Sequence, residues 1–239
     1  MMADAERPEV IDSDGHVVEP DTVWKDYAEP AFRDQLDVPG GGVQALGISR
    51  AYPNVAPPEP AGDGDTWAEN IGSETWDQES RLKMGRPGGY DPRARLIDMD
   101  AEGIDRAVLY PTSMLTWVEE AGLFGAACRA YNSWLRDYCA AAPTRLYGVG
   151  VVPVQDFDAA VAEMTRCVEE LGFKAIMIRP APYLGRKKLN HRDYDPFWAA
   201  AASIGCPIGI HPSPHGDMPN SCRHLGLFVL WLTTLRHVE

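Results

Sequence analysis

Short apolar runs alternate with amphipathic segments along residues 91–211 of this 239-residue chain. In the segments between the runs, apolar residues recur at steps of three and four, which is the spacing of a helix with one buried face. Strands that alternate with helices are usually joined in parallel by right-handed crossovers. We therefore predict an α/β protein with a parallel sheet, either doubly wound or closed into a (β/α)8 TIM barrel. The predicted strands are 104–110, 146–152, 174–178 and 206–211, preceded by a first strand that ends at His16.

Capping residues mark where three of the predicted helices begin and end. An aspartate is typical of a helix N-cap, because its carboxylate accepts a backbone N–H of the first turn. A glycine is typical of the position after the last turn, because the backbone there often adopts a left-handed conformation. These residues are Asp91, Asp156 and Asp195 at the starts, and Gly103, Gly172 and Gly205 at the ends.

Metal-ligating residue types stand at the ends of two predicted strands. In the first strand Asp14 and His16 are two positions apart, so their side chains should project from the same face. The run 206–211 ends in His211, which offers a third ligand. One carboxylate oxygen and imidazole nitrogens suit zinc or another borderline divalent ion. Because TIM-barrel active sites gather at the carboxyl ends of several strands, this placement favours the barrel over the doubly wound sheet.

Three further residues are candidates with two interpretations each. Asp12 shares the strand face of Asp14 but lies deeper, so it is either a further ligand or a structural hydrogen-bonding residue. Glu19 is either an orienter of a ligand histidine or a carboxylate at a helix start. Arg179 follows the strand 174–178 at the predicted barrel rim, where its guanidinium would clamp a substrate carboxylate or form a surface salt bridge.

Charge and cysteine content narrow the classes of partner. The chain has 35 acidic and 22 basic residues, a formal charge of −13, which argues against nucleic acid and anionic membranes and favours a small-molecule substrate. Its five cysteines lack a C-x-x-C spacing, so we interpret them as reduced thiols and expect a cytoplasmic protein. The first residues lack the features of a signal peptide, and no apolar run reaches the roughly 20 residues of a membrane span.

One irregular segment interrupts the pattern. Residues 30–90 contain glycine and proline clusters, and we predict an insertion or lid over the barrel mouth, with a disordered segment as the alternative. The chain 1–239 is otherwise predicted to be one domain.

Three segments together resemble a known family. They are the acidic-x-His strand 14–16, the segment 95–104, and 197–201 leading to 209–212. In these segments the chain resembles the amidohydrolase-related metal enzymes that include aminocarboxymuconate semialdehyde decarboxylase and the resorcylate-type decarboxylases. The resemblance implies a distorted (β/α)8 barrel whose metal is held by two residues of strand 1, a histidine after strand 5 and an aspartate after strand 8.

The resemblance carries over to particular residues. Asp14 and His16 match the strand 1 pair and His211 matches the strand 5 histidine, while Arg95 is a candidate substrate contact through the segment that it opens. The family's histidine after strand 6, implied as proton donor or acceptor, and its strand 8 aspartate would lie beyond Glu239. We therefore expect about five βα units, an incomplete barrel, and a truncated copy of a longer enzyme.

Three functions follow as alternatives. The first is a metal-dependent decarboxylase, a carbon–carbon lyase for an unsaturated or aromatic carboxylic acid, with Zn²⁺ as the expected ion and Mn²⁺ as an alternative. The second is a metal-dependent hydrolase of amide, lactone or ester-like bonds. The third is a non-catalytic remnant, whose two unpaired sheet edges would promote aggregation or a homo-oligomer.

Overall fold

Five parallel strands form the centre of the molecule. The computed structural model describes residues 7–20, 22–36, 87–115, 120–179 and 189–211. Within them the strand order follows the chain, and every neighbouring pair is parallel. A doubly wound sheet reverses its strand order at a switch point, whereas this sheet does not. The strands are β1 (Ile11–His16), β2 (Arg106–Tyr110), β3 (Leu146–Val151), β4 (Ala175–Ile178) and β5 (Ile208–Ile210).

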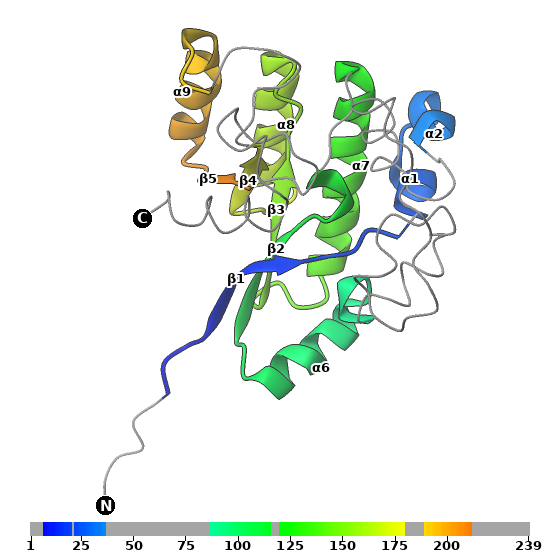
Figure 1. The fold of residues 1–239 in the computed structure, drawn as a ribbon, viewed down its shortest axis with the longest axis vertical. Coiled ribbons are helices and arrows are strands. Elements are labelled where there is room, and N and C mark those ends of the chain that lie inside the picture. The colour runs from blue at the N-terminus through cyan, green and yellow to red at the C-terminus, as the bar shows by residue number, and fades with distance from the viewer. Residues whose placement is uncertain (1–6, 21, 37–86, 116–119, 180–188, 212–239) are drawn as a thin grey trace, which may run out of the picture.

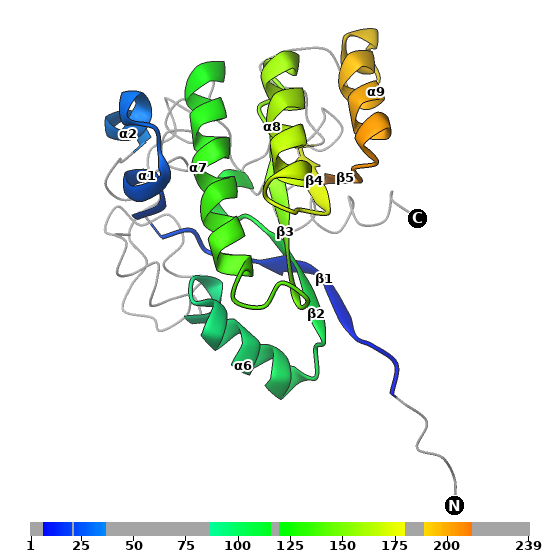
Figure 2. The ribbon, with the colours of Figure 1, turned by 180° about the vertical axis from the view of Figure 1, so that it is seen from behind.

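A helix connects each described strand to the next from β1 onward. Helices α7, α8 and α9 stand side by side against the sheet in both ribbon views, and α6 lies beside them at one end (Figures 1 and 2). The strands and helices together form a curled half-barrel, which confirms the α/β class and the incomplete TIM barrel. The helix bounds are α6 (Pro92–Glu102), α7 (Ala121–Cys139), α8 (Phe157–Glu169) and α9 (Asp195–Ile204). No helix in these described ranges has the length and apolar character that a bilayer span requires.

The predicted helix ends are found with two differences. One is at α8, which ends at Glu169 with Glu170 as its C-cap, while the predicted Gly172 lies two residues further on at φ of 74°. Asp91 accepts the N–H of Arg93, and Asp156 accepts the N–H of Ala159. Gly103 and Gly205 follow α6 and α9 in the left-handed conformation, at φ of 73° and 72°. The third predicted cap differs, because the aspartate at 195 is the first residue of α9 and Tyr194 is its N-cap, without a capping side chain.

Two short helices that the sequence pattern did not indicate pack beside α7. They are α1 (Thr22–Tyr27) and α2 (Pro30–Leu36), and the side chains of Trp24 and Leu36 are fully buried. The start of the predicted 30–90 insertion is therefore helical, and its end contains the 3-10 helix Pro87–Gly89. The remainder, 37–86, lies outside the described residues, so the lid stays a prediction there. The other 3-10 helices are Ser113–Leu115 and Arg192–Tyr194.

The core lies between the sheet and α7. Helix α7 buries most of one face. Gly148 lets β3 lie close to α7 and to Phe173, since a Cβ at this position would lie 2.8 Å from both Leu135 of α7 and Phe173. A buried polar link joins the same layers, because Asn132 both donates to and accepts from the backbone of Val151. The core therefore fixes the carboxyl end of β3, near the end of the sheet where the candidate site lies.

Candidate metal centre

Asp14, His16 and His211 lie together at the carboxyl end of the sheet. One ligand atom from each residue lies within 4.8 Å of the others. Asp14 Oδ1 is 3.3 Å from Nε2 of His211 and 3.8 Å from Nε2 of His16. The two imidazole rings are 5.1 Å apart between centroids. Because β1 and β5 are the two outer strands of the described sheet, only its curl brings these side chains together.

A break in the pairing of β1 lies directly before the candidate ligands. The register with β2 shifts between Asp12 and Gly15, as in a β-bulge. Asp12 accepts the backbone N–H of Asp14 at 3.1 Å, which is the structural role considered for it from the sequence. Asp14 itself is exposed, with 67% of its side-chain surface accessible, so a cation can reach its carboxylate from solvent.

A backbone carbonyl fixes the orientation of the His16 ring. His16 Nδ1 lies 2.7 Å from the carbonyl oxygen of Pro111, the residue after β2. A carbonyl can only accept, so Nδ1 carries the proton in this hydrogen bond. Nε2 is then the nitrogen with a free lone pair, and it is also the atom near Asp14.

Tyr110 is a residue of the site that the sequence did not indicate. It ends β2, and its ring centroid lies 5.2 Å from that of His211 and 6.2 Å from that of His16. Burial raises the pKa of the Tyr110 phenol, and the negative charge of Asp14 raises it further. Tyr110 therefore forms an aromatic wall beside the candidate ligands and remains a neutral phenol at neutral pH.

Arg95 binds the backbone at the carboxyl end of β1. Its Nε donates to the carbonyl of Gly88 at 2.9 Å, and its Nη2 donates to the carbonyl of His16. The Tyr138 hydroxyl donates to the same Gly88 carbonyl at 2.6 Å. Two guanidinium nitrogens of Arg95 thus bind backbone carbonyls and support the end of β1, and its predicted contact with a substrate stays a prediction.

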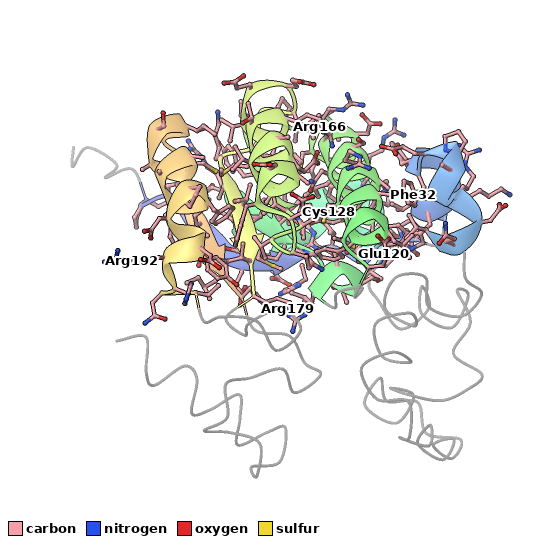
Figure 3. The ribbon with its side chains drawn as sticks, turned by 90° about the horizontal axis from the view of Figure 1, so that it is seen from above. Phe32, Glu120, Cys128, Arg166, Arg179 and Arg192 are labelled. Atoms are coloured by element: carbon pink, nitrogen blue, oxygen red, sulfur yellow. The ribbon has the colours of Figure 1, made fainter. Side chains whose placement is uncertain are left out.

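Arg179 directly follows β4 and is buried, with 2% of its surface exposed. Figure 3 labels it on the opposite side of the molecule from Arg166 of α8. Its place after a strand agrees with the sequence prediction, and its burial shows that the guanidinium is not at the surface. The predicted contact with a substrate carboxylate stays a prediction.

The donor atoms fit a divalent cation. One carboxylate and two imidazoles are a common partial ligand set for zinc and for manganese, and their mutual distances leave room for one ion among them. The hydrogen bond from His16 Nδ1 to a carbonyl is the usual outer contact of a ligating histidine. The predicted convergence of the three residues is thus confirmed, and their role as ligands stays a prediction.

A comparison with known families agrees with this geometry. A sequence model of the amidohydrolase family matches residues 11–230. The chain belongs to the amidohydrolase family. The match begins at β1 and includes all three candidate ligands of this amidohydrolase.

Curated relatives of this amidohydrolase are decarboxylases. The chain is 28% identical over 138 residues to a gamma-resorcylate decarboxylase of Polaromonas sp., an alignment that covers 56% of this chain and 41% of the relative. It is 32% identical over 145 residues to a gamma-resorcylate decarboxylase of Rhodococcus jostii, an alignment that covers 53% of this chain and 44% of the relative. The alignments therefore span less than half the length of these relatives.

Solved structures of similar fold include two aromatic acid decarboxylases. A 5-carboxyvanillate decarboxylase from Novosphingobium aromaticivorans, complexed with manganese and 4-hydroxy-3-methoxy-5-nitrobenzoic acid, matches with a TM-score of 0.55 and 26% identity. That match covers 87% of this amidohydrolase and 51% of the other chain. A 2,6-dihydroxybenzoate decarboxylase from Rhizobium matches with a TM-score of 0.53 and 20% identity, covering 91% and 53%, and supports the fold alone.

Proposed function

We propose that this amidohydrolase is a metal-dependent decarboxylase of an aromatic carboxylic acid. The observation that carries the proposal is the convergence of Asp14, His16 and His211 at the carboxyl end of the sheet. The sequence relatives support the reaction class, since the curated proteins named above are gamma-resorcylate decarboxylases. In this reaction the bond between the ring and the carboxyl carbon breaks, carbon dioxide leaves, and the ring carbon takes up a proton.

We propose that Asp14, His16 and His211 hold one divalent cation. When bound, the ion would supply Lewis-acid stabilisation of negative charge on substrate oxygens. The donor set suits Zn²⁺, the ion expected from the sequence, while the solved 5-carboxyvanillate decarboxylase holds manganese. We therefore propose manganese and zinc as the two ions to compare.

We propose that Arg179 binds the substrate carboxylate. It follows β4, and His211 follows the neighbouring strand β5, so both residues stand at the same end of the sheet. A guanidinium can bind a carboxylate through two parallel hydrogen bonds, which a lysine cannot do. An Arg179→Lys variant should accordingly raise KM more than it lowers kcat, as steady-state kinetics on the best substrate will test.

The activity is tested by incubation with a panel of acids in the presence of Mn²⁺ or Zn²⁺. The panel contains 2,6-dihydroxybenzoate and 5-carboxyvanillate, with an aryl amide and a lactone as tests of the hydrolytic alternative. We expect metal-dependent release of carbon dioxide from an aromatic acid, and loss of that release in the His211→Ala variant. Turnover of the amide or lactone alone would refute the decarboxylase assignment.

We also propose that the partner is a small carboxylic acid and that the protein is cytoplasmic. Four cysteines are buried free thiols in the described chain, namely Cys128, Cys139, Cys167 and Cys206. Buried reduced thiols are typical of a reducing compartment. Fractionation of the source cells with an antibody to the protein tests this location.

A further inference from the structure

The buried carboxylate of Glu19 binds the segment that follows β2. Glu19 is 1% exposed. Its Oε2 accepts the backbone N–H of Ser113 at 2.8 Å. The same carboxylate accepts the N–H of Thr112 at 3.2 Å and that of Met114 at 3.3 Å. Three successive N–H groups directed at one carboxylate fix the backbone conformation of these residues.

The peptide between Pro111 and Thr112 connects Glu19 to His16. Its N–H belongs to Thr112 and is bound by Glu19, and its C=O belongs to Pro111 and accepts from His16 Nδ1 at 2.7 Å. A peptide unit is planar, so its N–H and C=O turn together. The side chain of Glu19 therefore sets the direction of the carbonyl that binds the His16 ring.

We propose that Glu19 is a positioning residue for the candidate metal centre. By holding the 111–112 peptide, it keeps His16 in the tautomer with the proton on Nδ1, and keeps Nε2 directed toward Asp14 and His211. The consequence for metal affinity rests on the proposed function, whereas the consequence for the His16 tautomer does not. The bonds of Glu19 to residues 112–114 lie at the start of the 3-10 helix Ser113–Leu115, so the same contacts hold this helix start and the 111–112 peptide.

Glu120 provides a matched control in the same connection between β2 and α7. Its carboxylate also accepts two backbone N–H groups, from Gly122 at 2.8 Å and from Leu123. It is the N-cap of α7, and the peptide that contacts His16 is not among its hydrogen-bond partners. If the loss of a carboxylate that binds backbone N–H groups changed the site only through general destabilisation, the substitutions of Glu19 and Glu120 should have the same effect on His16.

The experiment compares Glu19→Gln and Glu120→Gln with the wild-type protein. A glutamine keeps the size of the side chain but presents one acceptor oxygen and an NH₂ group to the three donors. Nitrogen-15 NMR of the histidine rings, assigned with a His16→Ala variant, reports the tautomer without metal. We expect His16 as the Nδ1–H tautomer in the wild type and in Glu120→Gln, and a mixture of tautomers in Glu19→Gln. Titration with Mn²⁺ should give about 10-fold weaker binding in Glu19→Gln only.

Each outcome decides the inference. The inference is overturned if a folded Glu19→Gln protein keeps the wild-type His16 tautomer. It is also overturned if the Glu120→Gln control loses this tautomer to the same extent. If circular dichroism shows that Glu19→Gln does not fold, the NMR spectrum of the wild-type protein decides. The Nε2–H tautomer of His16 would overturn the inference, and the Nδ1–H tautomer would support it. If the tautomer responds but the wild type binds no Mn²⁺, the positioning role stands and the proposed function fails.

Discussion

At the residue scale, Gly209 lets the Tyr110 ring lie beside His211. A Cβ at position 209 would lie 3.0 Å from the Tyr110 hydroxyl oxygen and 3.3 Å from Cε1 of the same ring. The Gly209→Ala variant should therefore displace this ring from its place 5.2 Å from the imidazole. The displaced ring no longer supports the His211 imidazole in the same place, so we expect roughly 10-fold weaker Mn²⁺ binding by calorimetric titration.

The control for this prediction is Gly103→Ala. Gly103 has φ of 73° and no atom within 4 Å of a Cβ built on it. Alanine there should lower the free energy of unfolding by about 1 kcal/mol through backbone strain alone, without a change in metal binding. Equal metal affinity in the Gly209 and Gly103 variants would contradict the role of the tyrosine ring.

The residues that could be predicted from the sequence are those whose position follows from local periodicity. Asp14, His16 and His211 stand at strand ends, and the carboxyl ends of parallel strands meet at one edge of a sheet. Tyr110 was missed because its contacts are made with segments far away in the chain. The signal for Tyr110 was its position as the last residue of a strand, which is the same signal that identified the ligands.

At the element scale, Gly148 sets how closely β3 approaches its neighbours. A Cβ there would lie 2.8 Å from Leu135 of α7 and from Phe173, both of which are buried. We expect Gly148→Ala to lower the free energy of unfolding by about 1 to 3 kcal/mol in urea titrations. Gly122→Ala is the control, because the three atoms nearest to a Cβ there all belong to the Glu120 carboxylate and alanine favours the helix. Equal unfolding midpoints for the two variants would refute the packing account.

The element boundaries show where local patterns stop being sufficient. The strand predicted at 104–110 begins at Arg106, because the N–H of Ile104 binds Met99 and completes the end of α6. Helices α1 and α2 were not predicted because they have only 6 and 7 residues, too few to establish a helical period. Their stability comes from burial beside α7, which is a tertiary contact and leaves no signal in the local sequence.

At the scale of the whole molecule, buried thiols make the fold sensitive to alkali. Burial raises the pKa of the Cys139 thiol to about 12. In the unfolded chain the thiol ionises near pH 8.5, so its contribution to stability is complete below that pH and is lost as the pH rises toward 12. We expect this loss to reach roughly 1 to 2 kcal/mol at pH 10, from the factor of 1.36 kcal/mol per pKa unit.

A Cys139→Ala variant isolates this thiol from Cys128 and Cys167, whose pKa values are also raised by burial. The free energy of unfolding, measured in urea at pH 7 and at pH 10, should fall less in the variant than in the wild type. We expect the difference to be roughly 1 to 2 kcal/mol. The same loss in both proteins would show that the thiol at 139 does not ionise on unfolding.

The curl of the sheet is the property of the whole molecule on which the site depends. The sequence predicts each βα unit separately, because each has its own apolar period and caps. It does not predict how far β1 and β5 curve toward each other, since that depends on the packing of α7, α8 and α9 against the sheet (Figure 2). Residues 212–239 lie outside the part of the chain that the structure describes, so this curl is a property of the five strands before them.

If Asp14, His16 and His211 hold one divalent ion, each of the three side chains must contribute to metal affinity. Calorimetric titration of the purified, chelator-treated protein with Mn²⁺ and with Zn²⁺ gives stoichiometry and affinity for the wild type and for Asp14→Ala, His16→Ala and His211→Ala. We expect one ion per chain in the wild type and at least 10-fold weaker binding in each variant. A wild type that binds no ion, or three folded variants that bind it as tightly as the wild type, would show that these residues are not the ligands.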